Sequence, residues 1–344
     1  MSLLKSKRLP CLLVTGLVLL ISFSITGLAQ EKEPVDVIKV DTDLVVFDVQ
    51  VVDKKTKRVI GDLTRDDFEV SEKGVKQQVS YFGRDELPLS ILLLLDVSGS
   101  VRPILHQIRD GALNALRRLK PEDQVAVMAF ANTPALVQDF TKDRALVAKQ
   151  IEAATASERL GSGTLLGPAL NSAAMHMREA PTATSRRVII VITDNIAFAG
   201  GAEQKDILEE LFVNGTVVYG LIVRAVIGKV FNVVFLGTIH GVNHFVEETG
   251  GEILGASKNE VDAKLAVVID RLRARYALGF RPATDKDEFH RVEITISSAR
   301  KRKEKPAVLT KRGYYLRRRA SYRASDPNDS PECSGKRRSW RNYT

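Results

Sequence analysis

Three residues with oxygen-bearing side chains, Asp96, Ser98 and Ser100, form a D-x-S-x-S pattern at the end of the segment LSILLLLDVSGS. Alternate residues of a loop can turn a carboxylate and two hydroxyls toward one point. Two further candidates stand at the ends of later segments: Thr164 ends LGSGT, and Asp194 ends RRVIIVITD. Carboxylate, hydroxyl and water oxygens suit a hard cation such as Mg²⁺ or Mn²⁺. We therefore take these five residues as candidate metal ligands.

The segments before Asp96 and Asp194 are apolar on both sides, as central strands of a parallel sheet are. Residues 88–275 continue with helical and strand patterns in alternation, which predicts a doubly wound α/β domain. The expected helices span 102–119, 143–154, 164–177, 203–213, 243–249 and 259–273, and the other expected strands span 124–131, 135–140, 216–223 and 251–254. Ligands of such sheets bind at the carboxyl ends of the strands, near the point where strand order reverses. The candidate ligands stand at such ends.

β patterns flank this domain on both sides. Apolar and polar residues alternate in 35–53, and shorter alternating pieces follow to residue 85. After residue 275 come RYALGFRP, HRVEITIS and AVLTKRGYYL, within 276–316. We expect these C-terminal strands to pair with the N-terminal module of 35–85, so that the α/β domain is an insertion within a small β module.

At its candidate ligands the chain resembles the von Willebrand factor A (VWA) family and its metal-ion-dependent adhesion site. The resemblance implies that Asp96, Ser98, Ser100 and Thr164 coordinate the metal, with Asp194 acting directly or through water. It also implies an open position for an acidic residue of a partner protein. DLTRDDFEVSEKGVKQQVSYF before the domain and YALGFRP and TKRGYY after it resemble the flanks of a bacterial subgroup. Asn195 departs from that subgroup, which usually carries Gly there.

The N-terminal 29 residues have the order of a secretory signal peptide: basic Lys5, Lys7 and Arg8, an apolar run to Ile25, and small residues at a cleavage site. An uncleaved membrane anchor is the alternative. We favour cleavage, which predicts an exported protein, periplasmic or secreted. Cys333 is then the remaining cysteine, so no internal disulfide is expected.

The C-terminal segment is strongly basic. Residues 299–344 hold 15 Lys and Arg against 4 Asp and Glu. Two interpretations of the tail, 317–344, are open: a solvated, disordered end, or a segment that contacts anionic surfaces such as lipid headgroups. Because the tail has few aromatic residues and the chain is expected to be exported, nucleic-acid binding is not expected.

Three functions are compatible with these observations. The first is a non-catalytic, adhesion-type domain whose metal holds a partner's carboxylate. The second is an envelope scaffold with a degenerate metal site and a basic tail docked to anionic surfaces. The third, a metal-dependent hydrolase, needs a general base that the sequence does not offer. His240 and His244, followed by Glu248, have spacing that would suit zinc on a helix, but Gly241 intervenes and favours a loop.

Overall fold

The computed structural model describes residues 44–84, 87–181, 185–194, 204–224, 242–282, 288–297 and 305–315. All of these belong to one compact unit, residues 43–344. The predicted signal segment, most of the stretch 224–242 and the basic tail lie outside the described residues. Within the described ranges, no helix has the length and apolar character needed to cross a membrane.

A six-stranded sheet forms the centre of the α/β region, in the order β10-β9-β8-β5-β6-β7. Its strands are β5 (Leu89–Asp96), β6 (Gln124–Phe130), β7 (Pro134–Thr141), β8 (Arg186–Thr193), β9 (Val217–Arg224) and β10 (Ile253–Ser257). Neighbouring strands are parallel except at β7, which runs antiparallel to β6. Every residue of β5 is buried. The doubly wound, mostly parallel fold that the apolar runs predicted is confirmed.

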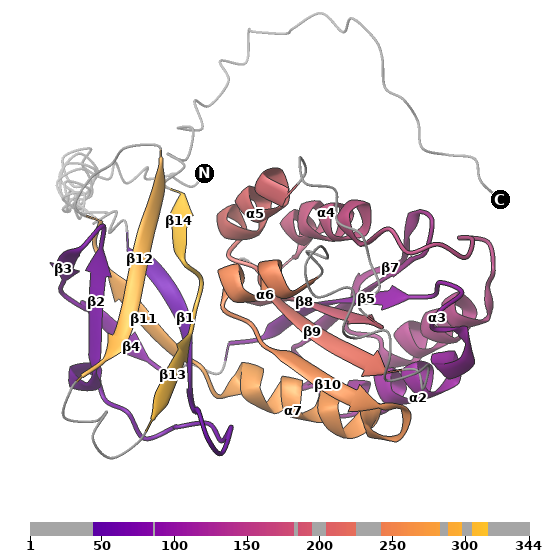
Figure 1. Ribbon diagram of the computed structural model, residues 1–344, viewed down its shortest axis with the longest axis horizontal. Coiled ribbons are helices and arrows are strands. Elements are labelled where there is room, and N and C mark those ends of the chain that lie inside the picture. Colours follow the sequence, from indigo (N-terminus) through magenta and orange to yellow (C-terminus); the bar gives the residue numbers. More distant parts are fainter. Residues whose placement is uncertain are drawn as a thin grey trace, which may run out of the picture. The chain divides into compact units, whose positions relative to one another are not determined.

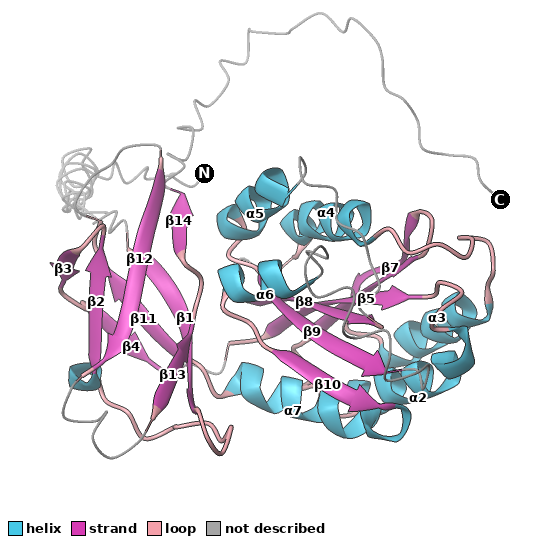
Figure 2. Cartoon of the chain, viewed as in Figure 1, coloured by secondary structure: helices cyan, strands magenta, loops and turns pink. Residues whose placement is uncertain are grey.

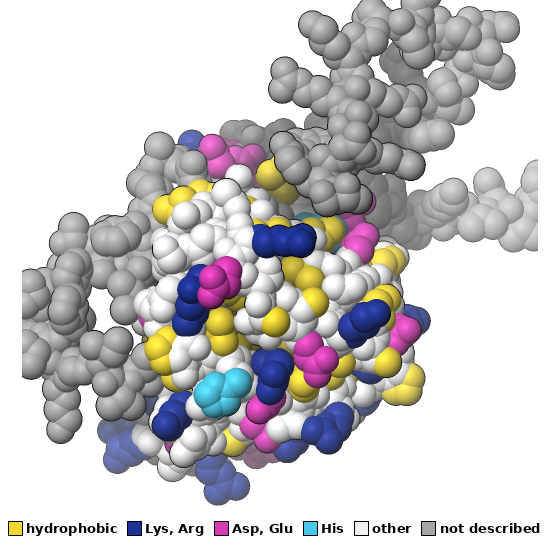
Figure 3. Space-filling view, turned by 90° about the vertical axis from the view of Figure 1, so that its right-hand side faces the viewer, with side chains coloured by type: hydrophobic (Ala, Val, Ile, Leu, Met, Phe, Trp, Pro, Cys, Tyr) yellow, Lys and Arg dark blue, Asp and Glu magenta, His cyan; other side chains and the backbone are white. Residues whose placement is uncertain are grey.

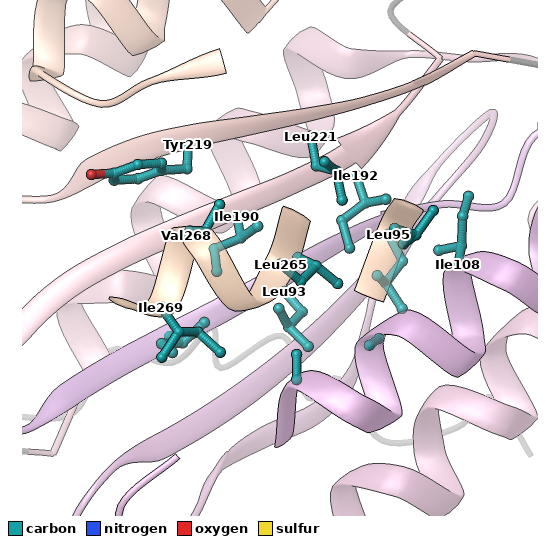
Figure 4. Packing of buried hydrophobic residues seen from close by; sticks show 14 of the residues in the cluster. Leu93, Leu95, Ile108, Ile190, Ile192, Tyr219, Leu221, Leu265, Val268 and Ile269 are labelled. Atoms are coloured by element: carbon teal, nitrogen blue, oxygen red, sulfur yellow. The ribbon is translucent and has the colours of Figure 1, made fainter. Parts of the chain in front are cut away.

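Helices cover both faces of this sheet (Figures 1 and 2). They are α2 (Leu105–Leu116), α3 (Arg144–Ala156), α4 (Leu166–His176), α5 (Gln204–Val213), α6 (Val242–Thr249) and α7 (Val261–Arg273). On one face, Leu93 and Leu95 of β5 pack with Ile108 of α2 and Leu265 of α7 (Figure 4). On the other face, Leu92 and Leu94 pack in the cluster that α4, α5 and α6 share. Because successive side chains of a strand point to opposite faces, the single apolar run of β5 contributes to both hydrophobic cores.

The strand order creates a topological switch point beside β5. The helix that follows β5, α2, packs on one face of the sheet, whereas the helix that follows β8, α5, packs on the other. β5 and β8 are parallel neighbours, so their carboxyl ends lie together where the connections diverge. Such a topological switch point is the usual ligand site of an open α/β sheet. Asp96 and Asp194 stand at these two strand ends.

The flanking strands build two antiparallel four-stranded sheets, in the orders β13-β1-β11-β4 and β14-β12-β2-β3. Their strands are β1 (Val45–Asp53), β2 (Phe68–Glu72), β3 (Val75–Gln77), β4 (Tyr81–Gly83), β11 (Tyr276–Phe280), β12 (Phe289–Ile296), β13 (Pro306–Leu309) and β14 (Gly313–Tyr315). Both sheets contribute to one aromatic-rich core, which includes Phe47, Phe68, Tyr276 and Tyr314. β1 pairs with β11 and β13, and β2 pairs with β12. The prediction that N- and C-terminal strands pair is thereby confirmed.

Two expected strands differ in detail. The segment AVLTKRGYYL forms not one strand but two, β13 and β14, which belong to different sheets. Between them the Thr310 hydroxyl donates to the Asp48 carbonyl at 3.0 Å, and the Arg312 amide donates to the Glu248 carbonyl at 3.0 Å. These two hydrogen bonds hold the segment that connects one sheet with the other. The strand expected at 251–254 begins at Ile253, because Gly250, with φ of 77°, and Gly251 form the turn that ends α6.

A buried polar cluster connects the β module with the α/β sheet. Arg275, 1% exposed, donates through Nη1 to the Tyr219 hydroxyl at 3.0 Å, and Tyr219 donates to Gln50 Oε1 at 2.7 Å. Its Nη2 atom donates to the carbonyls of Asp48, Gly250 and Leu309 at 3.0, 3.2 and 3.3 Å. Burial of a guanidinium is costly unless its donors are paired; here both Nη atoms donate hydrogen bonds, whereas Nε has no partner among the described residues. Arg275 therefore fixes strands from both regions around itself.

Candidate metal centre

The carboxylate of Asp96 is held rigidly at the end of β5. The side chain is fully buried. Its Oδ1 atom accepts a hydrogen bond from the Ser98 amide at 2.9 Å, and Oδ2 accepts one from the Thr193 hydroxyl at 2.6 Å. One bond comes from the loop that follows and the other from the neighbouring strand, so both oxygens are oriented before any ligand arrives.

Two hydroxyls follow this carboxylate in the same loop. Ser98 Oγ and Ser100 Oγ are 3.1 Å apart. Ser98 is fully buried, whereas Ser100 is partly exposed. The loop therefore offers two neighbouring hydroxyl oxygens, of which the second belongs to a residue that solvent can reach.

Asp194 follows β8 and is partly exposed. Burial raises the pKa of the Asp96 carboxyl; hydrogen bonds from Ser98 and Thr193 oppose the rise, and the negative charge of Asp194 adds to it. Burial of the Asp96 carboxylate is unfavourable for the protein alone, and the nearby negative charge of Asp194 adds to this to a smaller extent. A cation bound at Asp96 would offset both effects.

The loop that carries Thr164 lies against the D-x-S-x-S loop. The Gly99 amide donates to the Ser162 carbonyl at 2.9 Å. A Cβ atom at position 99 would come within 3.3 Å of Ser162, so glycine allows this close approach. A surface ion pair between Arg102 and Glu158, at 2.9 Å, spans the same two segments. Thr164 itself is partly buried, and the role of its hydroxyl as a ligand remains a prediction.

The donor set fits a hard divalent cation. Two carboxylates and three hydroxyls are all oxygen donors, as Mg²⁺ and Mn²⁺ prefer. Among the described residues, no group of three or more His, Cys, Asp or Glu side chains is arranged to hold a metal. The predicted set contains only two such residues, so it does not depend on a cluster of that kind. Three residues had a spacing that would suit zinc. Of these, His240 lies outside the described residues, and His244 and Glu248 lie on α6.

Sequence reasoning did not identify two residues that support this site. Thr193 orients Asp96, but a threonine at the end of an apolar strand carries no signal of that role. Asn132, in the turn after β6, accepts a hydrogen bond from Gly163, the residue before Thr164. Because the two bonded positions are 31 apart in the sequence, local pattern analysis does not detect this pairing.

Side chains of both charge signs surround this end of the sheet. The arrowheads of β5 and β10 point toward the right in Figure 1, and Figure 3 views the molecule from that side. Among the described side chains seen there, Lys and Arg are interspersed with Asp and Glu, and hydrophobic side chains are scattered among them (Figure 3). Close to the candidate ligands, Leu165 is 43% exposed.

A groove of about 360 Å³ lies elsewhere on the described surface. It is lined by residues of α5, α6, β12 and β14, among them Phe212, Phe289 and Tyr315. The ring centroids of Phe212 and Phe289 are 5.1 Å apart, and those of Phe289 and Tyr315 are 5.2 Å apart. The groove shares no lining residue with the candidate metal ligands.

Comparison with known families supports the assignment of the α/β region. The model of the von Willebrand factor type A domain matches residues 91–197. That stretch contains β5 with the D-x-S-x-S loop, the Thr164 loop, and β8 with Asp194. The resemblance noted in the sequence is confirmed there. No curated protein matches the chain.

Several solved structures resemble part of the chain. An aerotolerance-related membrane protein from Bacteroides fragilis is 18% identical, with a TM-score of 0.42, and the match covers 54% of this chain and 98% of that one. A von Willebrand factor type A protein from Catenulispora acidiphila is 8% identical, with a TM-score of 0.45, covering 75% and 71%. Proximal thread matrix protein 1 of the mussel byssus, solved with a zinc-occupied MIDAS motif, is 16% identical, with a TM-score of 0.38, covering 54% and 48%.

Proposed function

Because residues 91–197 match the von Willebrand factor type A domain, we propose that this chain binds a divalent cation at the carboxyl edge of its central sheet. In this proposal Asp96, Ser98, Ser100 and Thr164 hold the ion, and Asp194 acts directly or through water. The cation is Mg²⁺ or Mn²⁺, and it captures a carboxylate of a partner protein. The chain acts as a binding module rather than as an enzyme.

The observation that carries this proposal is the geometry at the end of β5. A fully buried carboxylate has both oxygens oriented by hydrogen bonds, and the Ser98 and Ser100 hydroxyls, 3.1 Å apart, follow it in the same loop. Burying a carboxylate without a cation is costly. The buried Asp96 carboxylate stands at the switch point, which is the usual ligand site of an open α/β sheet.

Bound at this site, Mg²⁺ would supply a positive charge and an open coordination position, which an acidic side chain of a partner can fill. The protein's own residues supply the rest. Asp96 and Asp194 balance the charge of the ion, while the neutral hydroxyls complete its surroundings without cancelling it. Because only two charged groups surround the ion and its other ligands are neutral, the ion can still accept an anionic group of the partner at its open position.

We also propose that the chain is exported, with cleavage near residue 29, so that this site acts in the periplasm or outside the cell. The basic, apolar and small-residue regions of residues 1–29 support this. N-terminal sequencing of the protein recovered from its native envelope fraction tests it. An N-terminus at Met1 or Ser2 would contradict cleavage.

Calorimetric titration with Mg²⁺ and Mn²⁺ tests the metal site. We expect saturable binding by the wild type and loss of about tenfold or more in affinity for Thr164→Ala, because a ligand oxygen is removed. Thr164→Ser is the matched control, since it keeps the hydroxyl. Asp96→Asn keeps a side chain of the same shape but loses the charge, and we expect it to abolish binding.

Unchanged affinity in both Asp96→Asn and Thr164→Ala would contradict the proposed ligands. Retention of the partner is tested by pull-down with and without EDTA. Capture by the wild type that resists EDTA and survives Thr164→Ala would contradict a metal-held carboxylate. Metal-dependent turnover of phosphate or ester substrates, lost in Asp96→Asn, would favour the hydrolase instead.

A further inference from the structure

The loop that carries Thr164 contacts one side chain, that of Asn132. The Gly163 amide donates to Asn132 Oδ1 at 2.6 Å. Backbone bonds flank this contact on both sides: the Asn132 amide donates to the Leu160 carbonyl at 2.9 Å, and the Leu165 amide donates to the Ala131 carbonyl at 2.9 Å. The turn after β6 therefore forms three hydrogen bonds with the loop, at Leu160, Gly163 and Leu165.

The two glycines of LGSGT leave the space that this side chain fills. A Cβ atom at either Gly161 or Gly163 would overlap the side-chain amide of Asn132. Gly161 also has a φ of 88°, a conformation that favours glycine. At Gly163 the obstacle is the asparagine alone, because no other neighbour lies within 4 Å of that Cβ position.

The opposite side of the same loop touches the D-x-S-x-S loop, where the Gly99 amide donates to the Ser162 carbonyl. The loop is thus held between two partners, and Thr164 directly follows the glycine that Asn132 binds. Small shifts of a ligand residue weaken a metal site, so groups that orient ligands matter nearly as much as the ligands.

We propose that Asn132 is a positioning residue for the metal site, which fixes the loop so that the Thr164 hydroxyl is presented to the cation. The inference rests on the proposed function, in which Thr164 is a ligand. Asn132 is largely exposed, so its replacement leaves the hydrophobic core intact.

Calorimetric titration with Mn²⁺ alone tests this role. We expect Asn132→Ala to lower the affinity about tenfold. Asn132→Asp keeps an acceptor oxygen for the Gly163 amide, and we expect its affinity to stay within about threefold of the wild type. The midpoint of urea unfolding should be nearly the same in all three proteins.

A double-mutant cycle sharpens the test. Gly163→Ala introduces a methyl group that overlaps Asn132 Oδ1, so we expect a loss of affinity at least as large as that of Asn132→Ala. The overlap disappears when residue 132 is alanine. Asn132→Ala/Gly163→Ala should therefore bind Mn²⁺ as Asn132→Ala does, and additive losses would overturn the proposal.

Failure of the two proposals is distinguishable. A wild type that ignores Mn²⁺ contradicts the metal site itself, whereas wild-type binding with full affinity in Asn132→Ala overturns only the role of Asn132. Hydrogen exchange on the metal-free protein adds an independent readout. The segment 160–165 should exchange faster in Asn132→Ala than in the wild type or Asn132→Asp, and equal rates would also overturn the proposal.

Discussion

The α/β region and the β module bury polar side chains for different ends. At the edge of the α/β sheet, Asp96 is buried among hydroxyls of Ser98 and Thr193, and its loop opens toward solvent at Ser100. In the β module, Glu72 is buried with its Oε1 atom bonded to His290 and Tyr314, all of them inside the sheets. The first arrangement is the one for which we propose a ligand; in the second, Glu72 Oε1 accepts two hydrogen bonds, whereas Oε2 has no partner among the described residues.

This comparison gives a way to distinguish a binding site from buried polar residues that only stabilise the fold. A structural cluster should contribute to stability and leave metal binding unchanged. A ligand site should do the reverse, because its groups are placed at a cost that the ligand offsets. Substitutions in the two regions should therefore have opposite signatures.

The largest effect on stability is expected at Arg275, which connects the two regions. Arg275→Met leaves the Asp48, Gly250 and Leu309 carbonyls without this donor, and the free energy of unfolding should fall by about 3–5 kcal/mol. Urea unfolding measures the loss. Arg178→Met is the matched control: Arg178 is 46% exposed in its ion pair with Glu210, and its loss should stay below about 1 kcal/mol.

Folded Arg275→Met should still bind Mn²⁺ within about threefold of the wild-type affinity, because its partners lie away from the D-x-S-x-S loop. A loss of stability below about 1 kcal/mol would contradict the structural role assigned to this arginine. If Arg275→Met lost metal binding without losing stability, the proposed difference between a structural cluster and a ligand site would be contradicted.

A smaller effect is expected at Glu72, which is 4% exposed. His290 Nδ1 lies 2.6 Å and the Tyr314 hydroxyl 2.8 Å from its Oε1 atom. Glu72→Ala removes the acceptor of two buried groups, so the free energy of unfolding should fall by about 2–3 kcal/mol. Glu69→Ala, on the exposed face of the same strand, should change it by less than about 0.5 kcal/mol. Equal effects of the two substitutions in thermal or urea unfolding would contradict the buried cluster.

The smallest effect is expected at Lys311, whose Nζ lies 4.7 Å from the centre of the Phe47 ring. Burial lowers the pKa of its ammonium group to about 8, although the charge of Asp48 opposes this. The unfolded chain keeps the proton up to its ordinary pKa of 10.5, so it binds more protons than the folded chain between pH 8 and 10. The free energy of unfolding should therefore rise with pH in that window, until ionisation of buried Tyr219 in the unfolded chain opposes it.

Lys311→Met should remove this rise and increase the free energy of unfolding at pH 7 by about 1–2 kcal/mol, less than the full shift implies because the side chain is partly exposed. Urea unfolding of both proteins between pH 7 and 10 measures the difference. A wild-type curve that falls across this window, or one that Lys311→Met leaves unchanged, would contradict the pKa assigned to Lys311.

Much of the fold was readable from local patterns. Residues 91–95, just before Asp96, are all apolar, as expected of a strand covered on both faces, and β5 is buried throughout. The spacing of Asp96, Ser98 and Ser100 places their side chains in one short loop, so their proximity needs only local chain geometry. The pairing of N- and C-terminal strands was expected from β patterns on both sides of the α/β region, and β1 does pair with β11.

Other features depend on partners far apart in the chain. Thr193 bonds to Asp96 across 97 residues, and Arg275 bonds to Gln50 across 225. Residues 306–315 divide between two sheets because each half meets a different strand. Periodicity reports which face of an element is buried, but not which atoms it meets.

The sequence alone thus determined the types of the candidate ligands and the strand ends at which they stand, because both follow from residue identity and hydrophobic period. The tertiary structure decided which hydrogen bonds orient Asp96 and that the turn at Asn132 holds the Thr164 loop. Those contacts join separate loops, and only the order of strands in the folded sheet brings such loops together.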